Sequence, residues 1–410
     1  MSGPFNGCQA VICQSQPLAL YVHCGAHCVN LVSQSVNESC TSIRDALQVV
    51  NDLGVLFAQS IVARTKFKDL ADPSASHFHQ IRPLCPTRWL VRVKAIQAVV
   101  TQYELVLQCL EELDAPGCTL ASRARGLHKQ LCQASIHLFL YMALRVFEPL
   151  ERLNRSLQAT YQTVAGMMEA VTSVIVELTA IRTDEEFELL MAETCKVQTE
   201  LNLDALEVPR TRKPPARYTG PAAATIPQSA ADYYRPKYFE IVDDAVVKLE
   251  QRFTKSTGLN TYAKLERILL SGEITEDDNK LLNSYPEISE DDLGPQLRMF
   301  RRTRQVSSLK DVVSELQNML PEVRGEYPDV CNLTKLLLVS PASSAEAERT
   351  FSALRRLKTW LRTTMTETRL NSVTVCHIHR HRLDKLDLKP LLRDFVLHSE
   401  IRSSLFGQFV

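Results

Sequence analysis

The sequence predicts a mainly α protein, and three observations lead to this prediction. Apolar residues recur at helical spacing along most of the 410 residues, and proline and glycine are nearly absent between residues 101 and 200. Only one short apolar run, Leu18–Val22, has the pattern of a buried strand. With 45% hydrophobic and 23% charged residues, the composition is that of a globular protein with two or three packed units.

Residues 1–100 contain the predicted strand and three helices. Leu18–Val22 leads into a helix that begins near His23, and a second, amphipathic helix is expected over residues 41–64. After a polar break at residues 71–76, the segment Leu84–Leu90 leads into a helix that continues through Val100. The residues that define the amphipathic helix are Ile43, Leu47, Val50, Phe57 and Ile61.

The middle of the chain divides into three segments by composition. Residues 101–206 are helical, residues 207–236 contain six prolines and form an extended linker, and residues 237–329 return to helix. Glu273–Asp292 holds eight acids against one lysine and is expected to be a loop-rich surface. One apolar stripe in the first segment consists of Leu150, Leu157, Tyr161, Val164 and Met168.

Residues 330–390 contain two consecutive amphipathic helices, followed by a tail over residues 391–410. Ser343 is predicted to cap the first helix in a capping box with Glu346, and Thr364 the second with Glu367. Apolar stripes this wide form either a core or a dimer interface, and periodicity alone leaves both open. The stripes contain Ala347, Phe351, Leu354, Leu357 and Leu361, with Trp360 flanking, and then Leu370, Val373 and Ile378.

Charge and cysteine content restrict the environment and the partners. The 47 basic and 47 acidic residues balance. Arg349–Arg382, however, holds eight basic residues against one acid, a pattern that fits either phosphate contacts or a solvated helix face. No apolar run is long enough to span a bilayer, and the N-terminus lacks the pattern of a signal peptide. The 12 scattered cysteines indicate reduced thiols in the nucleus or cytosol.

Cys24 and His27 lie one helical turn apart and have two interpretations. A cysteine and a histidine on one face suit zinc, but a closed site needs four ligands, and no second pair lies at zinc-finger spacing. The alternative is a helix start whose thiol and imidazole pack internally. His377 and His381 near the C-terminus have the same ambiguity between a metal pair and a solvated basic face.

Arg88 and Trp89 combine a cation with an aromatic ring at the start of a helix. Such a pair stacks on nucleic-acid bases or simply anchors the helix.

Taken in order, three motifs resemble those of hAT-superfamily transposases: Cys24/His27, Arg88/Trp89, and Ser344-Ala-Glu-Ala-Glu-Arg-Thr-Phe-Ser352. Vertebrate proteins of the zinc finger MYM type are similar members of this group. The resemblance implies an incomplete RNase H-like α/β core in residues 1–100, interrupted by a long helical insertion. It also implies a hAT C-terminal dimerisation region over residues 330–390.

The same resemblance implies a lost catalytic site. In the family, Glu348 corresponds to the last acid of an Asp/Asp/Glu triad that holds two divalent metals. The two aspartates are expected upstream of Met1, so the chain is expected to be N-terminally truncated, and residues 1–20 hold no acid. Glu348 is then a relic and the protein is not an enzyme. No cofactor is expected. Mg²⁺ or Mn²⁺ is expected only if an intact catalytic domain exists upstream, which would be the case if the gene model is truncated.

The function expected from the resemblance is non-catalytic dimerisation in the nucleus. The partner is a second copy or a related hAT-derived protein, with DNA as a further partner and no membrane. Two alternatives stay open, a fragment of a metal-dependent DNA transposase and a DNA-binding accessory protein. The residues expected at the dimer interface are Phe351, Leu354, Leu357, Trp360, Leu361 and Leu370.

Overall fold

The computed structural model describes residues 7–16, 18–71, 79–84, 92–159, 163–208, 227, 229–339, 342–359 and 364–407. Every regular element within these ranges is a helix, which confirms the prediction of a mainly α protein. The chain divides into two compact units, Met1–Ser343 and Ser344–Val410, which we call unit 1 and unit 2.

Unit 1 contains the long helices of the protein. They are α1 Cys8–Ser15, α2 Gly25–Ser39, α3 Thr41–Gln59, α4 Ile61–Leu70, α5 Arg92–Val100, α6 Tyr103–Leu113, α7 Ala121–Leu131, α8 Ala134–Leu157, α9 Val164–Ala180, α10 Asp184–Glu200, α11 Ala230–Leu249, η2 Glu250–Thr254, α12 Thr257–Ser271, α13 Glu276–Leu282, α14 Glu290–Thr303, α15 Leu309–Asn318, α16 Pro321–Arg324 and α17 Pro328–Val339.

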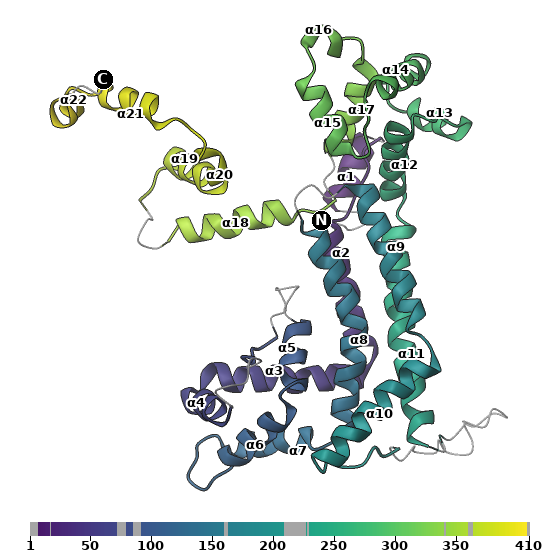
Figure 1. The fold of residues 1–410 in the computed structure, drawn as a ribbon, viewed down its shortest axis with the longest axis vertical. Helices are drawn as coiled ribbons and strands as arrows, with labels where there is room; N and C mark the ends of the chain where they lie inside the picture. Colours follow the sequence, from purple (N-terminus) through teal and green to yellow (C-terminus); the bar gives the residue numbers. More distant parts are fainter. Residues whose placement is uncertain are drawn as a thin grey trace. The chain divides into compact units, whose positions relative to one another are not determined.

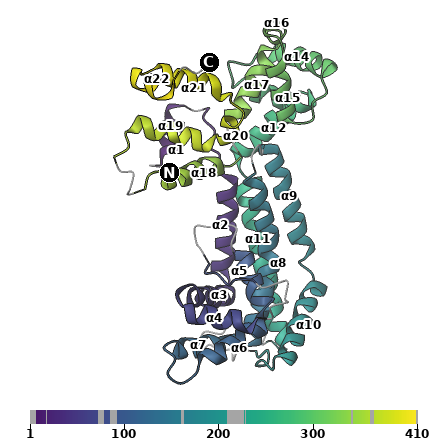
Figure 2. The same cartoon turned by 60° about the vertical axis from the view of Figure 1, so that its left-hand side comes forward.

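Helix α8 lies at the centre of unit 1 and packs against α2, α3, α5, α9 and α10 (Figure 1). Most of its 24 residues are buried, because apolar side chains lie on nearly every side of the helix. Helices α2, α8, α9 and α11 run side by side in both views (Figures 1 and 2). Within the described ranges, no single helix combines the length and the apolar content needed to cross a membrane.

A buried histidine, His137, lies in the interior between α8 and α10. Its Nδ1 is 3.2 Å from the Thr194 hydroxyl, and its ring packs against Tyr103 and Tyr141 with centroids 5.0 and 4.8 Å away. The residue is only 1% exposed, and this burial lowers its pKa to about 4. His137 is therefore a neutral core residue near pH 7.

One end of unit 1 is built around α17, which packs against α12, α14 and α15. Asp329 in its first turn accepts hydrogen bonds from the Ser289 amide at 2.8 Å and from the Gln296 side chain at 2.6 Å. The Gln296 carbonyl oxygen in turn accepts from the Asp329 amide at 2.9 Å. This reciprocal network ties α17 to the start of α14 because each buried polar group has a partner.

The predicted strand at Leu18–Val22 is wrong. These residues have no regular structure, and the described part of the chain contains no strand that pairs with them. A lone strand leaves its amides and carbonyls unpaired, so a strand is not stable here. The segment packs against a helix as irregular chain. The Tyr21 carbonyl approaches so closely that a Cβ on Gly258 of α12 would lie 2.7 Å from its oxygen. The RNase H-like α/β core is therefore not confirmed.

The single helix predicted over residues 41–64 is also wrong, because the chain bends at Ser60. Helices α3 and α4 meet there at 104°, and the Ser60 hydroxyl caps α4 by accepting from the Ala63 amide at 3.1 Å. Ile43 and Phe57 are buried as expected, whereas Ile61 is 72% exposed. A serine that satisfies the first amides of a new helix makes the break stable, although apolar spacing continues across it.

Two expectations for the middle of the chain, the apolar stripe and the linker, also need correction. The apolar stripe of residues 150–168 is divided between α8 and α9, with Tyr161 outside the described residues. Helix α11 begins at Ala230, inside the expected linker, because Ser229 and Asp232 form a capping box.

The acidic segment Glu273–Asp292 contains helix α13, contrary to the expected loop. Its Asp278 is buried against Arg267 and accepts from the Thr275 amide and hydroxyl, each at 2.8 Å. Burial alone raises the pKa of Asp278, but these hydrogen bonds outweigh it and hold the pKa below its usual range.

Gly54 of α3 lies directly under residues 81–84, and we expect Gly54→Ala to destabilise unit 1 by about 2 kcal/mol. A Cβ at this position would lie 2.3 Å from the Pro83 nitrogen and 2.4 Å from the Arg82 carbonyl carbon, so backbone must move. Gly126→Ala in α7 is the matched control, because its Cβ meets nothing within 4 Å. Urea denaturation should show this control to be stabilised by about 1 kcal/mol. Equal effects of the two substitutions would contradict the close approach.

Candidate dimerisation region

Unit 2 contains the helices on which the predicted interface residues lie. They are α18 Ala345–Leu357, α19 Glu367–Ile378, α20 Arg380–Leu383, α21 Leu388–Leu397 and α22 Glu400–Phe406. Helix α18 packs against α19, and α21 against α22.

The predicted interface residues are largely accessible. Phe351 is 70% exposed, and Leu354, Leu357 and Leu370 are half-buried. Trp360 and Leu361 lie outside the described residues. Because none of the four described side chains is fully buried in the chain itself, they keep apolar surface with which to bind a partner.

Unit 2 has almost no core of its own. Among its described residues, only Ala345 and Val396 are buried. Exposed apolar surface on this scale marks a site of interaction with another protein surface. The large apolar side chains that remain exposed are Phe351, Val375, Leu383, Leu386, Leu388, Leu391, Leu392, Phe395, Leu397, Ile401, Leu405 and Phe406.

Both predicted capping boxes are wrong by one or two residues. Helix α18 begins after Ser344, whose side chain makes no capping bond, and Glu346 instead pairs with Arg349 at 3.0 Å. In α19 the cap is Thr366, which accepts from the Arg369 amide at 3.4 Å. Several serines and threonines precede each helix, so spacing alone does not select the one that caps.

Glu348 lies in the first turn of α18. The Ser344 hydroxyl donates to its carboxylate at 3.2 Å, and a negative charge at this position stabilises the helix dipole. In the part of the chain that the structure describes, no three His, Cys, Asp or Glu side chains gather closely enough to hold a metal ion. His377 and His381 are exposed on α19 and α20.

Cys24 and His27 lie at the start of α2, where the structure places them beside residues far along the chain. The Cys24 sulfur is 3.6 Å from the Ser343 hydroxyl, and the Gly25 amide donates to the Ala342 carbonyl at 3.0 Å. A Cβ on Gly25 would lie 3.1 Å from that same carbonyl oxygen, so glycine permits the approach. The first motif thus contacts the residues that immediately precede the last motif, a contact within unit 1 that sequence spacing did not predict.

Cys28, the next cysteine along α2, is buried, and this burial raises the pKa of its thiol to about 11. Arg88 and Trp89 lie outside the described residues, so the structure does not test their role.

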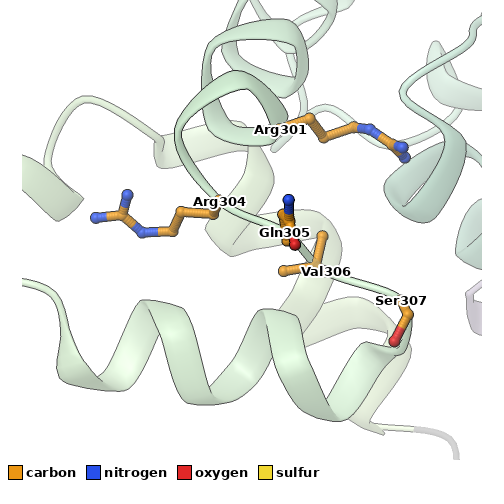
Figure 3. Close-up of a pocket in the computed structure, with 5 residues that line it drawn as sticks. All are labelled: Arg301, Arg304, Gln305, Val306 and Ser307. Carbon is orange, nitrogen blue, oxygen red and sulfur yellow. The ribbon is translucent and has the colours of Figure 1, made fainter.

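A hollow of about 410 Å³ lies at the end of α14, lined by Arg301, Arg304, Gln305, Val306 and Ser307. Figure 3 shows the two guanidinium groups pointing away from each other. Arg304 pairs with Glu315 of α15 at 3.0 Å. A ligand site needs converging polar groups, so this hollow does not compete with unit 2 as the functional site.

The accessible apolar helices of unit 2 define a protein-interaction module. The comparison with known families agrees: residues 305–380 match the model described as the hAT family C-terminal dimerisation region. The match covers α15–α17 of unit 1 and α18 to the start of α20 in unit 2. It supports a hAT-family origin for the chain and the formation of a dimer.

Proposed function

We propose that the protein is a non-catalytic, hAT-transposase-derived protein that dimerises through residues 330–390. The observation that carries this proposal is the exposed apolar surface of α18 and α19 inside the matched dimerisation region. When a second copy buries apolar surface that the chain itself leaves uncovered, the removal of that surface from water stabilises the dimer. Light scattering on the purified chain tests the proposal, and twice the mass of one chain is the expected result.

The non-catalytic part of the proposal is supported by the surroundings of Glu348. Its carboxylate has a structural role at the N-terminus of α18, where it accepts from Ser344 and needs no metal. A Mg²⁺-dependent nicking assay tests this part, with Glu348→Gln as the comparison. If the wild-type chain nicks DNA and Glu348→Gln abolishes the nicking, the result favours the alternative, a transposase fragment.

DNA binding is a second candidate function, favoured by the exposed basic side chains of unit 2. Accessible basic side chains are those of Arg355 and Arg356 on α18, of Lys358 directly after it, and of Arg380 and Arg382 on α20. Phosphate contacts release counterions, so the affinity for duplex DNA should fall steeply with salt. Absence of binding at low salt removes this candidate and leaves dimerisation unaffected.

A further inference from the structure

Helix α21 presents an apolar stripe formed by Leu388, Leu391, Leu392 and Phe395. These side chains recur at i, i+3, i+4 and i+7, so they share one face of the helix. They are between 44% and 61% exposed, whereas Val396, one turn beyond Leu392, is buried. The chain itself therefore leaves this stripe largely uncovered.

The hairpin of α21 and α22 holds this stripe in a defined orientation. Asp387 caps α21 by accepting from the Lys389 amide at 3.0 Å. At the other end, Arg402 donates to the Phe395 carbonyl at 3.2 Å, and its guanidinium lies 4.1 Å from the centroid of the Phe395 ring. The Ser403 hydroxyl donates to the Val396 carbonyl at 2.9 Å. These contacts fix the orientation of α21 relative to α22 and so the direction in which the stripe faces.

We propose that this stripe binds a second copy of the chain and extends the dimer interface beyond the matched family region. The match ends at residue 380, whereas the stripe begins at Leu388 of the same compact unit. This inference rests on the proposed dimerisation. When α18 and α19 pair with a second copy, the two α21–α22 hairpins enter the same complex at a high effective concentration.

The available area fits a second copy. The four stripe residues and Ile401 and Leu405 of α22 are each about half exposed or more, and each offers roughly 100 Å² of apolar surface. The hairpin therefore offers roughly 600 Å² per copy, which alone reaches the lower limit of a specific interface. Added to α18 and α19, it gives the dimer an area typical of a stable complex.

The test is the dimer dissociation constant of the full chain, measured by sedimentation velocity over a concentration series. We expect Leu391→Asp with Leu392→Asp to weaken dimerisation about 100-fold, because charge is buried in an apolar contact. The control is Lys389→Gln with Arg393→Gln, which changes net charge equally on the same helix but off the stripe. The control should keep the wild-type dissociation constant within about threefold. Circular dichroism confirms that both variants keep their helices, and Leu391→Gln with Leu392→Gln repeats the test without charge.

The outcomes separate this inference from the proposed function. A wild-type chain that stays monomeric overturns both. A dimer that Phe351→Asp with Leu354→Asp disrupts but the stripe variants do not overturns the inference alone. The inference alone is also overturned if the stripe variants lower the melting temperature of the chain but leave the dimer dissociation constant unchanged, because the stripe then packs within the chain. It is likewise overturned if the stripe variants leave the dimer intact and abolish only the binding of a protein other than a second copy.

Discussion

Replacing Phe351 and Leu354 by Asp should convert the dimer into a monomer, with a dissociation constant roughly 1,000-fold higher. Both side chains lie on the apolar face of α18, and the chain itself leaves Phe351 largely exposed. In a dimer each copy would bury two carboxylates without partners, four in all. Size-exclusion chromatography with light scattering measures the change directly.

The matched control for this substitution uses two exposed positions off the apolar face, Ser352 on α18 and Thr359 just beyond its end. Ser352→Asp with Thr359→Asp adds the same two charges at exposed positions, and the dimer should persist. Unit 1 has its own core, so its melting temperature should be unchanged in both double variants. If the two variants dimerise equally well, the interface does not include this face of α18.

The second large effect is a loss of stability in mild acid caused by His137. The pKa of this side chain is about 4 in the folded protein and 6.5 in the unfolded chain. Between these values the unfolded chain binds a proton that the folded protein does not. The free energy of unfolding therefore decreases as the pH falls from 6.5 to 4, by about 3 kcal/mol from this residue. This loss is absent above pH 6.5 and complete below pH 4, where both states bind the proton.

The contribution of His137 is isolated by removing both polar partners. His137→Phe with Thr194→Val keeps an aromatic ring at residue 137 and leaves no buried hydroxyl unpaired. Urea denaturation at pH 7 and pH 4.5 should show a smaller acid loss in this variant than in the wild type. His79→Gln, at an exposed position, should behave as the wild type does. Parallel pH profiles for all three proteins would show that burial of His137 does not cause the acid sensitivity.

Local patterns in the sequence predicted the helices well because apolar spacing reports which face packs. The amphipathic character of α3 and α18 follows from that spacing alone. The breaks between helices were missed for the same reason, since the apolar period continues across Ser60 while the backbone turns. Caps were placed one or two residues early because neighbouring serines and threonines compete for the same role.

Features that depend on distant parts of the chain were not predictable from local patterns. The contact of Cys24 with Ser343 joins residues 319 positions apart. The segment Leu18–Val22 has the apolar pattern of a strand, but a strand exists only when another strand pairs with it. The stripe on α21 has an evident helical pattern, yet only the structure shows that Val396 is buried while the four stripe residues stay exposed.

The small number of buried residues in unit 2 affects how the cell handles the protein. A segment with two buried side chains among its described residues gains little free energy from its own folding. Its order is therefore linked by mass action to the concentration of the partner. Because the proposed partner is a second copy, dilution should raise the monomeric fraction, whose accessible apolar helices are open to proteases and chaperones. We therefore expect the protein to be degraded faster at low concentration than at high concentration.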